Sequence, residues 1–371
     1  MSAAIDHGYM PSGKYIINHD IMYCTAEGVV GNHLYSGRAL GISEVKDKIQ
    51  LRPELLPFWQ DIIMHYERIG LTHTRDVIWH VDRDQLGKHI SHHPSVFYYG
   101  PHECRNWGDL EWLGAVEYVN SKNNFIELAR QLHVDVPNTL CFDSVSEITP
   151  QVIQELTYPC YLKAAVSVSG VGIYRCEHEQ AFIDALGMFD QDVAVQIQAE
   201  VKAKTFLNMQ YRVVNETPVR LACTNQLLDV FAHQGNKYPS RYEPWELLDP
   251  MAFWLTERGM KGVFAFDVAV VEGPDGVEFS VIECNPRFNG ASYPTIIAQK
   301  LDIPEWTAKI FSTHHRNLAD IHIKDLEFDK RTGEGAVIVN WGTILEGKLM
   351  VLMAGSEEYQ AALDDELKIR F

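Results

Sequence analysis

The chain has 371 residues, of which 46% are apolar and 22% are charged, so we expect a folded protein of two or three domains. It carries 32 Lys and Arg against 50 Asp and Glu, a formal net charge of −18, which argues against a nucleic-acid partner because phosphate backbones need cationic surface. A single phosphate ligand, held by backbone N–H groups and a few lysines, stays compatible with this charge.

The composition also argues against several classes of site and location. No apolar run approaches the about 18 residues of a membrane helix, so we expect no membrane partner, and the first residues lack the pattern of a signal peptide. Seven cysteines without a C-x-x-C pair favour reduced thiols in a cytoplasmic protein. The histidines at 89–102 lack the spacing of a catalytic zinc site, which leaves solvated loop residues as the main interpretation and a metal site as the alternative.

Residues 1–118 are predicted to form an N-terminal α/β domain, and they contain no phosphate-binding motif. Residues 54–69 place apolar side chains at helical spacing and end before Gly70, which predicts a helix. Two short runs rich in β-branched and aromatic residues, 76–81 and 95–99, predict strands.

From residue 121 the pattern becomes regular, beginning with Ser121 as the predicted N-cap of an amphipathic helix over 123–132. Strands are predicted at 134–141, 160–166, 172–176, 193–198, 205–214, 218–224, 262–271, 278–284 and 336–341, and helices at 152–156, 179–189 and 246–259. Hairpins interleaved with helices predict an α+β fold built around antiparallel sheets.

A lysine and a loop of small residues form the first candidate site. Lys163 lies in a predicted strand, and a loop without bulky side chains lets the backbone approach a phosphate closely. An ordinary β-turn beside a surface lysine is the alternative interpretation. Lys122, at the start of the predicted helix, is a second candidate, with a plain surface lysine as its alternative. The small residues of the loop are Ser167, Ser169, Gly170 and Gly172.

Two further predicted strands carry polar side chains within apolar runs. Alternation along a strand places Glu283 and Asn285 on one face, and a hairpin with the preceding strand could bring Asp267 beside them. Oxygen ligands on one face suit Mg²⁺, which binds few protein ligands together with phosphate oxygens. A buried salt bridge of Asp267 or Glu283 with Arg287 is the alternative interpretation.

Taken in chain order, these candidate residues and the segments around them resemble the ATP-grasp superfamily of ATP-dependent carboxylate–amine ligases. The resemblance covers residues 119–371, and its most specific block is 283–290, Glu-Cys-Asn-Pro-Arg-Phe-Asn-Gly. It implies that ATP lies between the antiparallel sheets of two α+β lobes, preceded by an N-terminal pre-ATP-grasp domain. The implied domains are 1–118, a small lobe at 119–197 with the glycine loop, and a large lobe at 198–371 with the metal-binding strands.

The resemblance also implies roles for individual residues. Asp267, Glu283 and Asn285 would bind two Mg²⁺ ions, and Arg287 would act with Glu283 in catalysis by steadying the transferred phosphoryl group or the substrate carboxylate. The implied nucleotide-binding residues are Lys122 and Lys163 for phosphates or adenine, Gln196, Gln198 and Ala199 for the adenine edge, Glu200 for ribose, and Ser167, Ser169, Gly170 and Gly172 for closure over the phosphates.

The implied reaction has two steps and uses small-molecule substrates. A carboxylate attacks the γ-phosphate of ATP to give an acylphosphate and ADP, and an amine then displaces phosphate. Amino-acid ligation, peptide-like natural products and siderophore assembly all stay open, as does the choice between a monomer and a homodimer. A small-molecule kinase and a nucleotide-binding module without catalysis are the alternative functions.

One polar segment is a candidate lid over this reaction. Residues 231–241 are polar, contain Gly235 and are long enough to act as a lid; a plain surface connection is the alternative. Within it, His233 or Arg241 could meet a substrate carboxylate, and Arg241 is the candidate catalytic residue.

Overall fold

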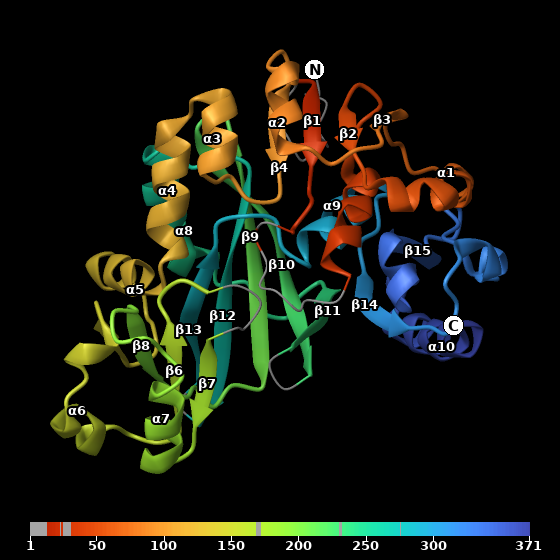
Figure 1. Ribbon diagram of the computed structural model, residues 1–371. Helices are drawn as coiled ribbons and strands as arrows, with labels where there is room; N and C mark the ends of the chain where they lie inside the picture. The colour runs from red at the N-terminus through yellow and green to blue at the C-terminus, as the bar shows by residue number, and fades with distance from the viewer. Residues whose placement is uncertain (1–12, 23, 25–30, 168–171, 230–231, 275) are drawn as a thin grey trace, which may run out of the picture.

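The structure is a computed structural model that describes residues 13–22, 24, 31–167, 172–229, 232–274 and 276–371. Its strands form one parallel sheet of four strands and two antiparallel sheets of eight and four strands (Figure 1). None of the helices in these residues combines the length and the apolar character needed to traverse a bilayer.

The N-terminal unit is built on the parallel sheet, in the order β3-β2-β1-β4. The expected helix over 54–69 is split, because Pro57 lies in a tight 3₁₀ turn and the regular α-helix begins only at Trp59. The elements are β1 (Tyr15–Asn18), η1 (Asn32–Ile42), β2 (Lys48–Gln50), η2 (Pro53–Phe58), α1 (Trp59–Arg68), β3 (Asp76–Ile78), α2 (Arg83–Leu86), η3 (Gly87–His89), β4 (His93–Val96), α3 (Pro101–Trp107) and α4 (Leu110–Asn120).

The small antiparallel sheet has the order β5-β8-β6-β7. The helix that precedes it begins where the sequence predicts, with the Ser121 hydroxyl accepting the N–H of Asn124 at 3.4 Å. The elements are α5 (Lys122–Gln131), β5 (Thr139–Phe142), η4 (Val145–Glu147), α6 (Pro150–Glu155), β6 (Cys160–Ala164), β7 (Ile173–Cys176), α7 (Glu179–Leu186) and β8 (Val195–Ala199).

The large antiparallel sheet has the order β13-β12-β9-β10-β11-β14-β16-β15. Its long hairpin β12–β13 packs against α5 and so joins the large sheet to the small one (Figure 1). The elements are β9 (Thr205–Val214), β10 (Thr217–Asp229), β11 (Ala232–Tyr238), α8 (Trp245–Glu257), β12 (Val263–Gly273), β13 (Gly276–Asn285), α9 (Ser292–Lys300), β14 (Trp306–Ser312), η5 (Leu318–Asp320), η6 (Lys324–Leu326), β15 (Gly335–Asn340), η7 (Gly342–Glu346), β16 (Lys348–Ala354) and α10 (Glu357–Arg370).

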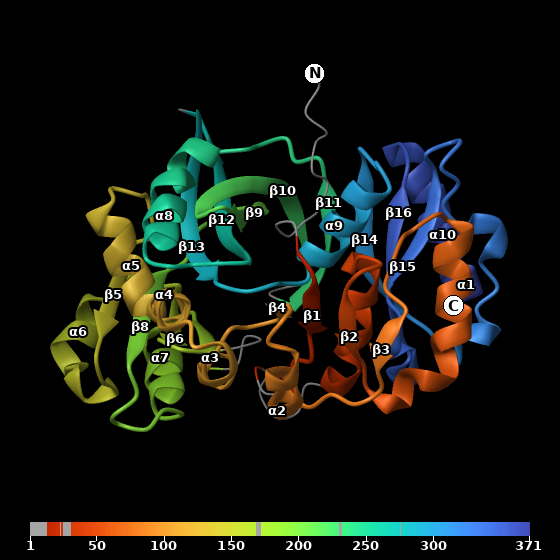
Figure 2. The ribbon, with the colours of Figure 1, turned by 90° about the horizontal axis from the view of Figure 1, so that it is seen from above.

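The two ends of the chain share one hydrophobic core. Side chains of the N-terminal unit such as Ile17 and Tyr66 belong to the same buried cluster as Trp341 and Leu352 near the C-terminus, and the Tyr66 hydroxyl donates to the carbonyl of Ile338 at 3.2 Å. In Figure 2 the strands β1–β3 accordingly lie beside β14, β15 and β16. The N-terminal unit is therefore held against the far half of the eight-stranded sheet.

The segment predicted as a lid is instead part of the large sheet. Phe231 lies outside the described residues, but β11 pairs with β10 on one side and with β14 on the other. The lid prediction and its surface-connection alternative are therefore both wrong for 232–238. Local sequence patterns did not reveal this strand because it lacks apolar alternation. A strand between two neighbouring strands can do without that alternation when its polar side chains are hydrogen-bonded, as His233 is to Asn236 (2.6 Å).

Gly235 allows the close approach of β11 to β14. A Cβ atom at Gly235 would lie 2.0 Å from the carbonyl oxygen of Ala308 in the neighbouring strand. Gly235→Ala is therefore expected to lower the free energy of unfolding by about 1–3 kcal/mol, the usual cost of overpacking. Urea unfolding followed by circular dichroism measures it. The control is Gly114→Ala in α4, where nothing lies within 4 Å of the added methyl group; equal stability of the two variants would contradict the prediction.

Candidate active site

The hairpin β12–β13 brings the three predicted metal-binding residues together. Asp267 is the register partner of Glu283, and Ala265 is the partner of Asn285, with a bulge directly after Asp267. The Asn285 amide donates to Oδ2 of Asp267 at 3.0 Å. Side-chain alternation along β13 therefore places the three polar groups on one face of the hairpin.

Asp267 is surrounded by amides rather than by cations. Its Oδ1 accepts hydrogen bonds from Asn208 and Gln226, each at 2.8 Å, and no ion pair to Asp267 is found among the described residues. Burial, reinforced by the charge of Glu283, raises the pKa of Asp267 to about 7. Asn208 and Gln226 were missed at the sequence level because they lie on β9 and β10, whose register with β12 no local pattern reveals.

Glu283 makes an ion pair with Lys122, at 2.8 Å between Nζ and Oε2. Burial by itself would raise the pKa of Glu283, but the charges of Lys122, Lys163 and Arg287 outweigh it and hold the pKa at about 2. Lys122 is 8% exposed, so it is not the plain surface lysine of the alternative interpretation. The alternative interpretation, a salt bridge of Asp267 or Glu283 with Arg287, is not found among the described residues, where Glu283 pairs with Lys122 instead.

The small sheet presents a polar face to the polar side chains of the β12–β13 hairpin. Lys163 is the register partner of Gln196 and donates to Oε1 of Gln198 at 2.7 Å, and Gln198 in turn donates to Thr139. Both polar side-chain atoms of the fully buried Gln196 lack a hydrogen-bond partner. Because such buried groups are costly, Gln196 is poised for a ligand or an ordered water.

The end of β8 is already engaged within the protein. The N–H of Ala199 donates to the carbonyl of Asn138 at 2.8 Å, and the N–H of Glu200 donates to that of Pro159 at 3.2 Å. The carboxylate of Glu200 accepts hydrogen bonds from Arg175 and Tyr161, and the Arg175 bond is the main cause of its lowered pKa. An adenine or ribose contact here would have to use other groups or exchange these partners.

The loop after β6 is only partly described. Ser167 is partly buried, whereas Ser169 and Gly170 lie outside the described residues. Gly172 has φ of 72°, a conformation that favours glycine. Its carbonyl accepts the N–H of Ala164 at 2.9 Å, so Gly172 closes the β6–β7 hairpin.

If Lys163 contacts a phosphate of the nucleotide, as the resemblance implies, nucleotide binding is expected to depend on pH. Burial lowers the pKa of Lys163 to about 8 in the free protein, whereas a bound phosphate would raise it. The affinity for ADP is therefore expected to be full below pH 8 and to fall as the pH rises further, by at most about tenfold per pH unit, because binding then takes up a proton. Calorimetric titration between pH 7 and 10 tests this.

Two variants separate the effect of Lys163 from general alkaline effects. In Lys163→Met the slope with pH should disappear and the affinity should be low throughout. Lys202→Met, which removes an exposed lysine close in sequence, should keep the slope of the wild type. A wild-type affinity that does not change across this range would contradict the prediction.

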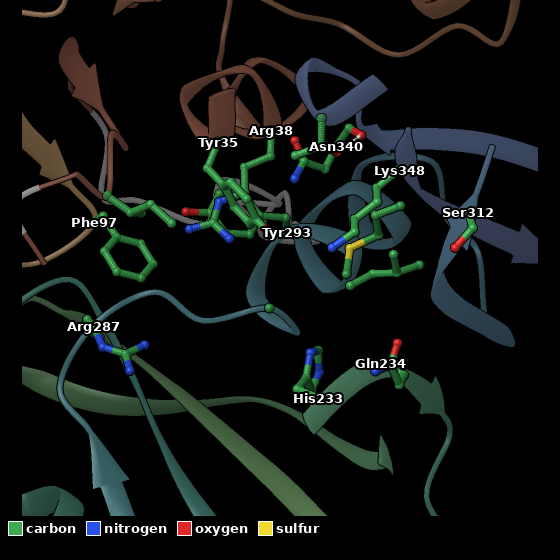
Figure 3. A pocket seen from close by; sticks show the side chains of 15 residues that line it. Tyr35, Arg38, Phe97, His233, Gln234, Arg287, Tyr293, Ser312, Asn340 and Lys348 are labelled. Atoms are coloured by element: carbon green, nitrogen blue, oxygen red, sulfur yellow. Dashed lines mark hydrogen bonds between the residues drawn. The ribbon is translucent and has the colours of Figure 1, made fainter. Parts of the chain in front are cut away.

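Arg287 lies directly after the hairpin and faces a cavity of about 390 Å³. The cavity lies between the N-terminal unit and β11, β14, β15 and β16; Figure 3 shows Arg287, His233 and Gln234 on one side and Arg38, Tyr293 and Lys348 opposite. Sequence reasoning found only Arg287 and His233 of this lining, since the others have no local motif. Arg241, the predicted catalytic arginine, does not line this cavity. It is exposed, and its guanidinium lies over the ring of Tyr242.

The donor set on the hairpin fits Mg²⁺. Asp267 is a partly buried carboxylate without a cationic partner among the described residues, and its raised pKa shows that a cation would stabilise its charge. In the described part of the chain, no three His, Cys, Asp or Glu side chains gather in a metal-binding group. The groups on this face that could hold a metal are Asp267, Glu283 and the amide oxygen of Asn285, which together with oxygens of a ligand make the kind of donor set that Mg²⁺ commonly has.

Comparison with known proteins gives the fold. No family model matches the chain. N5-carboxyaminoimidazole ribonucleotide synthetase in complex with ADP matches with a TM-score of 0.59 and 14% identity, over 97% of each chain. The Staphylococcus aureus N5-carboxyaminoimidazole synthetase with ADP matches with a TM-score of 0.59 and 12% identity over 96% of each chain. The L-amino acid ligase of Bacillus licheniformis matches with a TM-score of 0.53 and 11% identity over 97% of each chain. The chain therefore has the ATP-grasp fold with an N-terminal domain, as expected.

Proposed function

We propose that the protein is an ATP-dependent ligase that activates a carboxylate as an acylphosphate and joins it to an amine, releasing ADP and phosphate. The observation that supports this most directly is the position of Arg287, which lies between the carboxylates of the hairpin and the cavity. One guanidinium can thus contact both a transferred phosphoryl group and an acid held in the cavity. The fold shared with proteins solved as ADP complexes supports the same proposal.

The nucleotide would lie between the small sheet and the hairpin β12–β13. Lys122 and Lys163 would bind its phosphates, since both are buried cations near Glu283. The partnerless amide of Gln196 would supply a further polar contact. Mg²⁺ held by the hairpin would neutralise charge on the phosphates and keep them in one orientation.

The cavity residues would orient the acid and protect the activated intermediate. Arg287 would align the carboxylate with the γ-phosphate and balance the charge that develops during transfer. In the first step the carboxylate oxygen bonds to phosphorus and ADP leaves; in the second the amine nitrogen bonds to the acyl carbon and phosphate leaves. The walls contributed by the N-terminal unit would keep water from the acylphosphate.

Trapping with hydroxylamine tests the class of reaction. With ATP, Mg²⁺ and an accepted acid, hydroxylamine is expected to replace the amine and to yield an acyl hydroxamate together with an equal amount of ADP. A screen of acids, singly and with amines, followed by chromatography of the nucleotide, identifies both products. AMP as the nucleotide product would contradict an acylphosphate, and a stable phosphorylated product without hydroxamate would indicate a kinase.

A further inference from the structure

The described lining of the cavity beside Arg287 contains cationic side chains and no carboxylate. Three of its lining side chains are Arg38, Arg287 and Lys348, and none of the described lining residues is Asp or Glu. Its volume of about 390 Å³ falls at the small end of ligand cavities, which span about 300–1,000 Å³. The protein as a whole carries a net charge of −18, so this local excess of positive charge runs against the general trend of the chain.

Arg38 is buried without a counter-ion. It is 6% exposed, its Nε and Nη2 atoms have no hydrogen-bond partner, and no ion pair of Arg38 is found in the described part of the chain. Its guanidinium lies 4.2 Å from the ring centroid of Tyr293 and 4.9 Å from those of Tyr35 and Phe97. The rings hold the cation in place, and a hydrogen bond between Arg38 and the Tyr293 side chain is one of the influences on the pKa of Tyr293, but Nε and Nη2 of Arg38 have no acceptor. Such a group is costly unless an anion completes it.

Arg287 and Lys348 complete a cationic lining around one space. The guanidinium of Arg287 lies 5.2 Å from the ring centroid of Phe97, the ring that Arg38 also contacts. Lys348 extends into the cavity from the opposite wall (Figure 3) and has no ion pair among the residues that the structure describes. One small molecule in the cavity can therefore meet a cation at each end.

We propose that the acid bound in this cavity is a dianion, whose second anionic group is held by Arg38 and Lys348. The inference rests on the proposed function, which assigns the first carboxylate to Arg287. Charge complementarity carries it: a zwitterionic amino acid would place its ammonium group among cations, with no carboxylate of the lining to receive it. A second carboxylate and a phosphate monoester share the required chemistry, because guanidinium groups bind both through paired oxygens.

Four probes of similar size test the proposal by calorimetry on the full chain, without ATP or Mg²⁺. Glutarate carries two carboxylates, phosphoglycolate replaces one by phosphate, pentanoate lacks the second anion, and γ-aminobutyrate replaces it by an ammonium group. Glutarate or phosphoglycolate is expected to bind at least about tenfold more tightly than pentanoate and γ-aminobutyrate, because a hydrogen bond between charged groups strengthens binding by at least that factor. The tighter of these two names the second anion as carboxylate or phosphate.

Two variants assign that difference to the cavity. Lys348→Met and Arg38→Met should each weaken binding of the dianion by about tenfold or more and leave pentanoate little changed. Arg38→Met should not lower the melting temperature of the free protein, because it removes an uncompensated buried charge. The exposed Lys324→Met is the matched control and should bind all four probes as the wild type does.

The contrary outcomes are distinct. Equal binding of glutarate and pentanoate, tighter binding of γ-aminobutyrate, no binding of either dianion at millimolar concentration, or an unaffected Lys348→Met protein would each overturn the inference. Hydroxamate formation from monoanionic acids alone would also overturn it while leaving the ligase function standing. Binding of dianions without ADP formation from any acid would instead refute the ligase function and leave the anion site standing.

Discussion

Glu283→Gln is expected to lower the rate of ADP formation by about a hundred- to a thousandfold, which is the usual effect of losing one group that stabilises transition-state charge. Gln keeps the shape of the side chain and can still accept a hydrogen bond from Lys122, but it removes the negative charge on the hairpin face that would hold Mg²⁺. ADP release with the accepted acid, at saturating Mg²⁺, measures the change. Normal turnover by a folded Glu283→Gln protein would refute the assignment.

The choice of Gln follows from the ion pair of Glu283. Glu283→Ala would leave the buried Lys122 without its partner, and breaking a buried pair in this way costs about 3–5 kcal/mol. A loss of activity in the alanine variant could then reflect unfolding. Glu278→Gln, at an exposed position of the same strand, is the control for turnover and should match the wild type in urea unfolding within about 1 kcal/mol. Glu283→Gln loses the charge but keeps an acceptor for Lys122, so it should destabilise the protein less than Glu283→Ala does, and urea unfolding checks that it is folded in the assay.

Arg287→Met is expected to reduce kcat by about a hundred- to a thousandfold with little change in the affinity for ADP. The reason is its position: Arg287 faces the cavity and the ring of Phe97, whereas the lysines proposed for nucleotide binding lie on α5 and β6. Steady-state kinetics with the accepted acid gives kcat and KM, and calorimetry gives the affinity for ADP.

Two further variants define what Arg287 contributes. Arg287→Lys keeps the charge but loses the planar pair of donors, so it should recover only part of kcat. Arg258→Met removes an exposed arginine that stacks on Trp254 in α8, and it should behave as the wild type does. An Arg287→Met protein that loses ADP binding but keeps kcat would place Arg287 at the nucleotide instead.

Local patterns in the sequence were enough to predict the hairpin that carries the three proposed metal-binding residues and the helix that carries Lys122. Side-chain alternation along the strand predicted that Glu283 and Asn285 share a face, and a hairpin with the preceding strand was expected to bring Asp267 beside them; β12 and β13 pair in that way. Ser121 likewise predicted the start of α5 and so the position of Lys122. These features depend on neighbours in sequence, where side-chain period and capping act directly.

Predictions failed where partners distant in sequence decide the structure. Residues 232–238 resemble a polar loop, yet the chain makes them a central strand because β10 and β14 satisfy their backbone groups. Arg241 resembled a catalytic arginine within that loop, but it is exposed beyond the end of the strand. Neither outcome could be reached from residues 231–241 alone.

By itself the sequence determined the class of fold, the hairpin residues and the acidic balance of −18. Only the tertiary structure decided where the cations lie. Arg38 and Lys348 are far apart in the chain and belong to no motif. They line the same cavity because the N-terminal unit and β14–β16 share one buried hydrophobic core. Hydrophobic burial is non-directional and acts across any sequence separation, so it can place two charges in one cavity that no local pattern connects.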